Sequence, residues 1–379
     1  MAKEFGWRGN LLLALGSTIL SLALVIGVGE FAVRYHERHR DTVPGTMPFL
    51  YYRHSRLGSA LVRDTNYFGW VRVNRQGFRG PEVVEDHPKG MLRIMAVGGS
   101  TTFDVSVGGQ GRSWPERLAV WLSQADPVRR IEVINAGVPG YRVFDNLIRL
   151  QSELYRYKPD LVILYEGHND LFAAFRWAGH GLAQSNDRPG EIAYVTPWRH
   201  WFESNSLLYN KLLRRWQAIN FQRAGARARQ AAADRQVENA VRSGVGQFRH
   251  DLSGFLALAR NLGVRVALLE NLNVSGPGAR QPANPAAREV WERAIPYAPP
   301  ETVLEAYERY NQVIKEVAAD FSITWISTRD FGLVGAEWYA EGDVMHFNER
   351  GADRMAQQMA RSLIAAGLLR DPALSSSGR

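Results

Sequence analysis

The sequence contains no cysteine among its 379 residues. That absence excludes disulfide bonds, thiolate metal sites, a cysteine nucleophile and the lipidated N-terminal cysteine of a lipoprotein. It is compatible with an oxidising compartment, where a stray thiol is a liability, but it does not assign one. Internal repeats are also lacking, and low complexity is confined to the Ser/Gly-rich end after Pro372.

Residues with the chemistry to hold metals or phosphates are not grouped either. No cluster of His, Asp and Glu has the spacing of metal ligands, and no glycine-rich loop follows the Walker pattern. We therefore expect no metal and no other cofactor. With 45% hydrophobic and 22% charged residues, the composition is that of an ordinary globular protein. The length allows one large α/β domain with additions, or two small domains.

Positive charge is concentrated in one part of the chain. Residues 199–249 hold ten Lys or Arg and three Asp or Glu, a net charge of +7 out of +8 for the whole chain. A basic stretch of this kind can bind nucleic acid or an anionic membrane surface, or it can be the solvated face of helices. We favour the solvated face and expect no nucleic-acid partner.

A long apolar run follows the first few residues. The 21 residues between Arg8 and Glu30 carry no charge and are mostly Leu, Val, Ile, Ala or Gly. At about 1.5 Å per residue, a helix of this length spans the hydrocarbon core of a bilayer. The run is long for a cleaved signal peptide, and no Ala-x-Ala-like site follows it. We therefore predict a short head at 1–9 and an uncleaved membrane anchor at 10–29.

Charge does not decide the orientation of this anchor. Lys3 and Arg8 precede the run, whereas Arg34, Arg38 and Arg40 follow it, which is slightly unfavourable to a cytoplasmic N-terminus. Large domains are translocated largely regardless of charge, and a short head before a span is how a secreted domain stays tethered. We therefore place the large domain outside the cytoplasm, in the periplasm.

The rest of the chain divides by its hydrophobic pattern. Residues 30–88 are expected to form a juxtamembrane tether, with aromatic clusters and a turn-rich run at Asn74–Pro81. A folded domain at 89–370 and a flexible tail at 371–379 follow. Within the domain, the stretch 172–243 is too long for a βα connection, so we expect an inserted helical lid there.

The domain alternates strand-like and helix-like segments. Apolar runs predict strands at Leu92–Val97, Ile131–Ile134, Leu161–Tyr165, Val264–Leu269 and Ile323–Ile326. Helical patterns lie between and after them, at about 115–124, 143–157, 245–262, 303–320 and 350–367. This alternation predicts a parallel sheet covered by helices on both faces. In such sheets the chemistry collects at the carboxyl ends of the strands.

The first predicted strand ends in Gly98–Gly99–Ser100–Thr101. The two glycines permit a sharp turn that lifts the Ser100 hydroxyl above the sheet edge, with nearby backbone N–H groups facing a developing oxyanion. A glycine turn with a helix-capping serine, or a phosphate-binding loop, has the same pattern. The motif alone is therefore weak evidence for catalysis.

Three later positions carry complementary chemistry. Gly140, after the second strand, lets a backbone N–H approach a ligand closely, and Asn169, after the third, can donate its side-chain amide to an oxyanion. Near the C-terminus, Asp343 and His346 lie three residues apart before a predicted helix. That spacing lets the carboxylate orient the ring and leaves Nε2 free to take a proton. Each pattern by itself also fits an ordinary loop, an Asx turn or a surface turn.

The four patterns occur in the order Ser, Gly, Asn, Asp-x-x-His, at loops on one predicted sheet edge. In this respect the sequence resembles the SGNH (GDSL-type) hydrolase superfamily, over about Leu92 to Leu369 apart from the insertion. One position departs from the family pattern. The usual Gly-Asp-Ser-Leu is Gly-Gly-Ser-Thr here, and the missing aspartate is not a member of the triad.

The resemblance implies a flavodoxin-like three-layer α/β/α sandwich and a set of roles. Ser100 matches the nucleophile, Gly140 and Asn169 match oxyanion donors, and Asp343 and His346 match the acid and base of the triad. It implies a serine esterase that hydrolyses acyl esters of small molecules or glycans, O-acetyl esters among them, through an acyl-enzyme intermediate. Two alternatives stay open, namely acyl transfer to cell-envelope glycans and a catalytically silent glycan-binding module. The oligomeric state is not indicated.

Other features have two interpretations each. His168 can touch substrate, but we expect an exposed histidine in a turn. Glu166 and Asp170 can be a carboxylate pair for glycoside hydrolysis, which their spacing around a tight turn disfavours. Apolar residues recur at helical spacing from Leu207 to Ile219, beside basic residues. They predict a helix packed on the domain or, alternatively, an interfacial helix resting on anionic lipid.

Overall fold

The computed structural model describes residues 7–38, 51–54, 56–67, 71–179, 201–202, 206–209, 211–213, 215–216, 219, 234–295 and 298–369. Its body is built on a sheet of five parallel strands in the order β6-β5-β7-β8-β9. The strands are β5 (Met91–Gly98), β6 (Arg130–Asn135), β7 (Leu161–Tyr165), β8 (Arg265–Leu269) and β9 (Thr324–Ile326). This is the strand order of flavodoxin-like folds. The predicted fold class is therefore confirmed.

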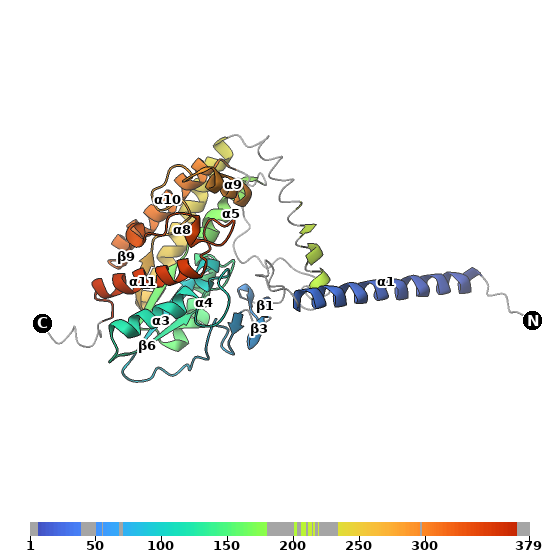
Figure 1. The fold of residues 1–379 in the computed structure, drawn as a ribbon, viewed down its shortest axis with the longest axis horizontal. Coiled ribbons are helices and arrows are strands. Elements are labelled where there is room, and N and C mark those ends of the chain that lie inside the picture. Colours follow the sequence, from blue (N-terminus) through green and yellow to red (C-terminus); the bar gives the residue numbers. More distant parts are fainter. Residues whose placement is uncertain are drawn as a thin grey trace, which may run out of the picture.

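Helices cover both faces of the sheet (Figure 1). On one face α3 (Trp114–Ala125) packs against α11 (Glu349–Ala365). On the other, α8 (Asp234–Asn261) packs against α4 (Val143–Ser152), α5 (His168–Gly179) and α10 (Pro300–Asp320). Because both faces are covered, the central strands β5 and β7 are buried along their whole length. That burial explains why they are nearly continuous apolar runs in the sequence.

Two helical segments differ from the sequence-based expectation. The segment at 143–157 is divided, because α4 ends at Ser152 and a separate 3-10 turn spans Leu154–Tyr157. The helix α9 (Pro285–Ala294) was not predicted, although Asn284 caps it with its side chain and a proline occupies its first position. Those two residues are a recognisable helix start, but the helix has few buried positions and so a weak apolar period.

The expected insertion at 172–243 begins and ends inside regular helices of the body. Residues 172–179 belong to α5, and residues 234–243 form the first part of α8. Between them the structure describes only helical turns from 201 to 219. Most of the expected lid, and the expected tail at 371–379, therefore lie outside the described residues.

The segment expected as a tether contributes two small antiparallel sheets. β1 (Tyr51–His54) pairs with β2 (Gly58–Leu61), and β3 (Thr65–Tyr67) pairs with β4 (Val71–Val73). A second apolar cluster joins this part of the chain to loops at the carboxyl edge of the main sheet. Its buried members are Leu57, Leu61, Val71, Val73, Phe103, Val138 and Tyr141. Much of the segment before residue 89 is thus packed into the body.

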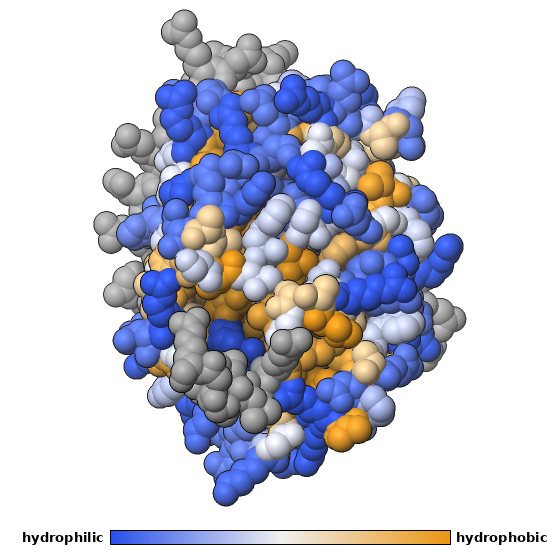
Figure 2. Space-filling model, turned by 90° about the vertical axis from the view of Figure 1, so that its left-hand side faces the viewer, coloured by the Kyte–Doolittle hydropathy of each residue, from blue (hydrophilic) through white to orange (hydrophobic). Residues whose placement is uncertain are grey.

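The first helix, α1 (Trp7–Arg38), projects from the body (Figure 1). Its stretch Gly9–His36 has a mean hydropathy of 2.5 over its most apolar part, and none of that part is buried. By length and composition this helix can cross a membrane, as a signal sequence also can. The face of the molecule on the side away from α1 is mostly polar, with apolar side chains gathered across its middle (Figure 2).

Candidate active site

Ser100 is the first residue of α2 (Ser100–Phe103), a single turn that follows β5 after Gly99. The two preceding glycines leave no room for a side chain. A Cβ on Gly98 would lie 2.2 Å from Thr102 Oγ1, and one on Gly99 would lie 2.4 Å from Asn169 Nδ2. Glycine permits this close approach and so allows the tight turn. The turn places Ser100 at the carboxyl edge of the central strand.

His346 connects Ser100 to Asp343. Its Nε2 lies 2.8 Å from Ser100 Oγ, and its Nδ1 lies 2.8 Å from Asp343 Oδ2. The turn that carries both residues leads directly into α11, which begins with the side chain of Asn348 accepting from the Gly351 N–H at 2.9 Å. When Nδ1–H is donated to the carboxylate, Nε2 is free to accept the serine proton. The three residues form one hydrogen-bonded chain with the geometry of nucleophile, base and orienting acid.

The Asp343 carboxylate is held in its charged form. Burial by itself raises the pKa of this group. Hydrogen bonds from the His346 ring and from the backbone N–H groups of His346 and Met345 outweigh that effect, and the pKa lies below its ordinary value. A charged carboxylate favours the ring tautomer with hydrogen on Nδ1 and stabilises the imidazolium that forms when Nε2 takes a proton.

Asn169 and Gly140 lie in loops next to the turn that carries Ser100. The Asn169 Nδ2 donates to the Tyr141 carbonyl at 2.7 Å, and its closeness to Gly99 places it beside Ser100. Gly140 has a φ of +85°, a conformation that favours glycine. Its loop is tied to β5 by the Val138 N–H, which donates to the Gly98 carbonyl at 2.9 Å. One hydrogen of the Asn169 amide remains for a further acceptor.

Comparison with known proteins supplies the family. Residues 96–354, more than half of the chain, match the model of the GDSL-like lipase/acylhydrolase family. The chain belongs to this family. The family resemblance inferred from the four sequence patterns is thereby confirmed. No curated protein matches the chain significantly.

Several solved structures are similar to this GDSL-like chain. Axe2, an acetylxylan esterase from Geobacillus stearothermophilus, has 13% identity and a TM-score of 0.43, with 75% of this chain and 98% of that chain covered. The acetyl xylan esterase AlAXEase has 15% identity and a TM-score of 0.42, with 73% and 99% covered. A GDSL-like lipase from Bacteroides thetaiotaomicron has 14% identity and a TM-score of 0.40, with 75% and 93% covered.

His168 is not the exposed turn residue that its sequence context predicted. It is 1% exposed, and its ring nitrogens lie 3.0 Å from the Tyr307 hydroxyl and 3.3 Å from the Tyr165 hydroxyl. Burial lowers its pKa to about 3. His168 is therefore a neutral, internal side chain of this GDSL-like protein. The expectation was wrong because His168 begins α5, which packs inward, and no local pattern shows that packing.

Glu166 and Asp170 are also buried, and they bind the start of α4. Glu166 Oε1 accepts from Asn146 Nδ2 at 2.7 Å, and Asp170 Oδ2 accepts from the Val143 N–H at 3.4 Å. Burial raises the pKa of both carboxyls, that of Asp170 to about 7. Both are therefore engaged in joining β7 and α5 to α4, which disfavours their use as a glycosidase pair.

Two buried ionisable residues near Ser100 were not singled out from the sequence. Asp104 accepts from the Trp114 N–H at 2.9 Å, and burial raises its pKa to about 7 although Arg79 is nearby. Arg79 itself is 3% exposed. Neither residue falls in one of the four family patterns, and Arg79 lies in a run whose sequence predicts only turns. No local signal distinguishes such residues from solvated charges.

A groove of about 460 Å³ lies beside these residues. It is lined by residues 106–110 and Arg112, which follow α2, and by Asn348 and Glu349, which follow His346. Within the ranges that the structure describes, no group of three or more His, Asp or Glu side chains could hold a metal ion. The groove thus adjoins the two turns that carry Ser100 and His346.

Proposed function

We propose that the chain is a serine esterase that cleaves acyl esters through an acyl-enzyme intermediate. The observation that carries this proposal is the hydrogen-bonded chain Asp343–His346–Ser100, with 2.8 Å at both links, in a member of an acylhydrolase family. A hydrogen bond that only joined these two turns would need just two residues. The third, charged residue, which orients the histidine on the serine hydroxyl, therefore favours a catalytic role. This arrangement activates a weak nucleophile.

The proposed reaction has two stages. Ser100 Oγ attacks the ester carbonyl carbon while its proton passes to His346 Nε2, and the charged Asp343 stabilises the imidazolium. The tetrahedral intermediate then expels the alcohol, which takes the proton from Nε2. In the second stage a water molecule gives its proton to Nε2 and attacks the acyl group, and the acid leaves as Ser100 regains a proton.

The developing oxyanion needs hydrogen-bond donors. We propose that the backbone N–H groups of Ser100 and Gly140 and the free hydrogen of the Asn169 amide provide them. The bond from Asn169 to the Tyr141 carbonyl supports this, because it fixes the amide beside the Gly140 loop before substrate binds. Such preorganised donors act where charge develops and need no rearrangement during the reaction.

The acyl group and the alcohol of the substrate follow only from the family resemblance. It allows O-acetyl esters of carbohydrates and other short acyl esters, so the substrate is proposed to be a small-molecule or glycan ester. Acyl transfer to a glycan hydroxyl uses the same acyl-enzyme and differs only in the second nucleophile. Measuring hydrolysis with and without added glycan acceptor separates these two outcomes.

Replacing Ser100 with alanine removes the nucleophile. Ser100→Ala should reduce turnover of a p-nitrophenyl ester by several orders of magnitude, on the order of 10⁶ if this triad behaves like the best-studied ones. A fluorophosphonate should label the unmodified protein at Ser100 and leave the variant unlabelled. Ser152→Ala serves as the control, because the Ser152 hydroxyl bonds only within α4 and lies away from the site. More than about a tenth of normal turnover in purified Ser100→Ala would exclude the assignment.

Asn169→Ala tests the oxyanion donor. Because the amide acts mainly in the transition state, kcat should fall about 10²–10³-fold, some 2.7–4 kcal/mol, while KM changes little. The variant also loses the bond to the Tyr141 carbonyl, so its melting temperature must be measured in parallel. A kcat within about threefold of normal in a folded variant would remove Asn169 from the proposed oxyanion hole.

We also propose that α1 anchors the protein in a membrane, with the esterase domain in the periplasm. Fused to the C-terminus, alkaline phosphatase, which is active only outside the cytoplasm, should be active, and green fluorescent protein should not be. Removal of residues 1–29 should release a soluble enzyme, because the site residues lie after β5. Phosphatase inactive at the C-terminus together with a fluorescent fusion would reverse the proposed orientation.

A further inference from the structure

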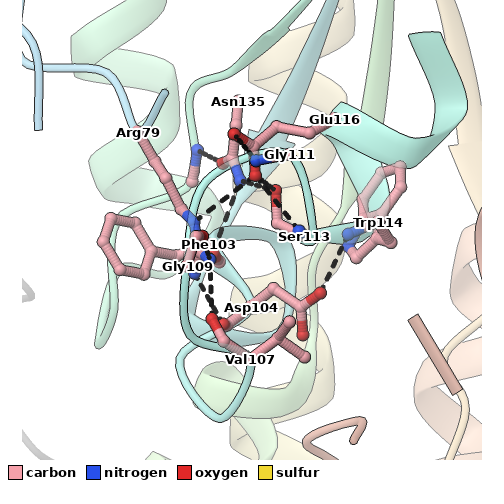
Figure 3. Close-up of polar contacts among 11 residues, drawn as sticks. Arg79, Phe103, Asp104, Val107, Gly109, Gly111, Ser113, Trp114, Glu116 and Asn135 are labelled. Atoms are coloured by element: carbon pink, nitrogen blue, oxygen red, sulfur yellow. Dashed lines mark hydrogen bonds and ion pairs between the residues drawn. The ribbon is translucent and has the colours of Figure 1, made fainter. Parts of the chain in front are cut away.

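Arg79 reaches from the segment before the main sheet into the loop behind the nucleophile (Figure 3). Its guanidinium is buried and donates to four backbone carbonyls, those of Phe103 at 2.9 Å, Asp104 at 2.7 Å, Val107 at 2.6 Å and Gly109 at 3.3 Å. All four lie within ten residues after Ser100. One side chain therefore binds the end of α2 and most of the loop that lines the groove.

The carbonyl groups of this loop have few donors besides Arg79: that of Asp104 also accepts from the Val107 N–H at 3.1 Å, and that of Phe103 from Asn135 Nδ2 at 3.4 Å. The helix α2 has a single turn and ends at Phe103, and the next residue, Asp104, adopts a left-handed φ of +66°. Carbonyls at the end of a helix have no partner within the helix. Left buried and unpaired, each would cost free energy comparable to a lost hydrogen bond. The planar fork of an arginine supplies several donors in fixed directions, which an ammonium group does not.

Arg79 is itself held in place by its surroundings. Its backbone N–H donates to the Asn135 carbonyl at the end of β6, at 3.2 Å. The preceding turn is fixed by Asn74, whose side chain accepts from the Phe78 N–H at 2.8 Å. Because Arg79 is bonded both to the end of β6 and to the loop after Ser100, it fixes that loop relative to the main sheet. It also lies outside residues 96–354, the part that matches the family model.

We propose that Arg79 is a positioning residue for Ser100. By binding four carbonyls between Phe103 and Gly109, it fixes the turn of α2. Ser100 Oγ thereby stays within hydrogen-bonding distance of His346 Nε2. It acts through the backbone and does not touch the reacting atoms. This proposal rests on the proposed esterase function, and its test is arranged so that the two can fail separately.

Arg93 provides a matched control. It is also buried, and it donates to the carbonyls of Tyr157 at 2.6 Å, Val84 at 2.9 Å and Glu85 at 3.2 Å. It lies near the start of β5, whereas Ser100 follows the end of the same strand. Loss of either arginine removes several bonds to backbone carbonyls, and loss of Arg93 also removes its ion pair with Glu132, but only Arg79 contacts the loop after Ser100.

The experiment compares Arg79→Lys with Arg93→Lys in the full chain purified in detergent. Both variants should have lower melting temperatures. Arg79→Lys alone should lose about 10²-fold in kcat towards p-nitrophenyl acetate, because a displacement of about 1 Å at a reacting group has an effect of that size. Its rate of labelling by a fluorophosphonate should fall by a similar factor, while Arg93→Lys stays within about twofold.

Equal kcat and labelling rate in folded Arg79→Lys and the unmodified protein would overturn the proposal. If Arg79→Lys does not fold, Arg79→Gln decides, because its neutral amide leaves no unpaired charge in the buried site but can donate to only some of the four carbonyls. Slower labelling of Ser100 in that variant supports the proposal, and an unchanged rate overturns it. Failure of the unmodified protein to be labelled at all would instead refute the esterase function.

The helix α1 is bonded to a segment far from it in the sequence. Glu30 of α1 accepts hydrogen bonds from the Ser206 hydroxyl at 2.8 Å and from the N–H groups of Leu207 and Leu208 at 2.9 and 3.0 Å. Gly29 is packed so closely there that a Cβ would lie 2.8 Å from a Leu208 methyl carbon. The start of the segment 206–219 is thus fixed to α1 directly after the uncharged run at 9–29.

From this attachment the segment runs across the direction of α1 (Figure 1). Its described residues are helical at 207–209, 211–213, 215–216 and 219. Leu212, Trp216 and Ile219 are 59%, 63% and 41% exposed, and their spacing of four and three residues places them on one helical face. Lys211 and Arg215 each precede one of these apolar residues.

We infer that the segment 206–219 lies on the surface of the bilayer that α1 enters, with Leu212, Trp216 and Ile219 turned to the lipid. A helix attached crosswise at the end of a membrane span lies along the membrane plane. Apolar residues beside basic ones suit the boundary between acyl chains and anionic headgroups. The inference rests on the proposed membrane anchor and is independent of the esterase chemistry.

The absence of cysteine makes a direct test available. Single cysteines at Leu212 and Trp216 are labelled with the environment-sensitive fluorophore NBD in full-chain protein reconstituted into phosphatidylcholine/phosphatidylglycerol vesicles. Leu20→Cys reports on the anchor, and Val128→Cys, 95% exposed before β6 at the amino edge of the sheet, reports on the body. Lipids carrying a shallow doxyl group should quench positions 212 and 216 strongly, and should leave position 128 unquenched.

Quenching at 20 but not at 212 and 216 would refute the surface segment while leaving the anchor intact. Protection of 212 and 216 that depends on protein concentration, without quenching by lipid, would show a second copy on this face and also refute it. Lack of quenching at 20 by lipids that carry a doxyl group deep in the acyl chain would refute the anchor itself, because Leu20 lies at the middle of the uncharged run 9–29. Glu30→Gln should reduce quenching at 212 and 216 without changing it at 20, since apart from its pair with Arg34 in the same helix the carboxylate binds, among the described residues, only the crosswise segment.

Discussion

The hydrogen bond between Ser100 Oγ and His346 Nε2 joins residues that are 246 positions apart in the chain. It exists only if the end of the central strand and the turn before the last helix keep their relative positions to within a few tenths of an ångström. The rest of the structure can be understood through that constraint. The parallel sheet sets the edge, glycines at 98 and 99 allow the nucleophile turn, and α11 packed on α3 holds the histidine turn against it.

Buried polar side chains surround this contact. His168, Glu166, Asp170, Asp104 and Arg79 are all nearly inaccessible to water, and each has a protein hydrogen-bond partner. In a low-dielectric interior such groups are costly unless they are paired, and when paired they permit only one arrangement. Burial moves the pKa of His168 down and those of the three carboxyls up. These shifts favour the neutral forms of the histidine and the three carboxyls. Asp343 differs from them, because its hydrogen bonds lower its pKa and keep it charged.

The N-terminal third of the chain is linked to the candidate site and also carries the proposed membrane anchor. Leu61, Val71 and Val73 pack with Phe103, which ends the nucleophile helix, and Arg79 binds the carbonyls that follow. The same region is connected through its preceding residues to α1, whose Glu30 holds the segment at 206–219. The helix proposed as the membrane anchor and the residues that pack on the Ser100 turn therefore belong to the same part of the chain.

The sequence by itself determined the five strands of the main sheet and most of the helices around them, because continuous apolar runs and an apolar period of 3.6 residues reflect burial that is local to each element. It also determined the four blocks that contain Ser100, Gly140, Asn169 and the pair Asp343 and His346, since each block follows an apolar run or precedes a helix. Only the tertiary structure decided that His168 is internal, that residues before 89 pack into the body, and that Arg79 holds the nucleophile loop. Those facts depend on contacts between distant segments. A buried, paired arginine and a solvated one are identical in sequence, and only the packing around them distinguishes the two.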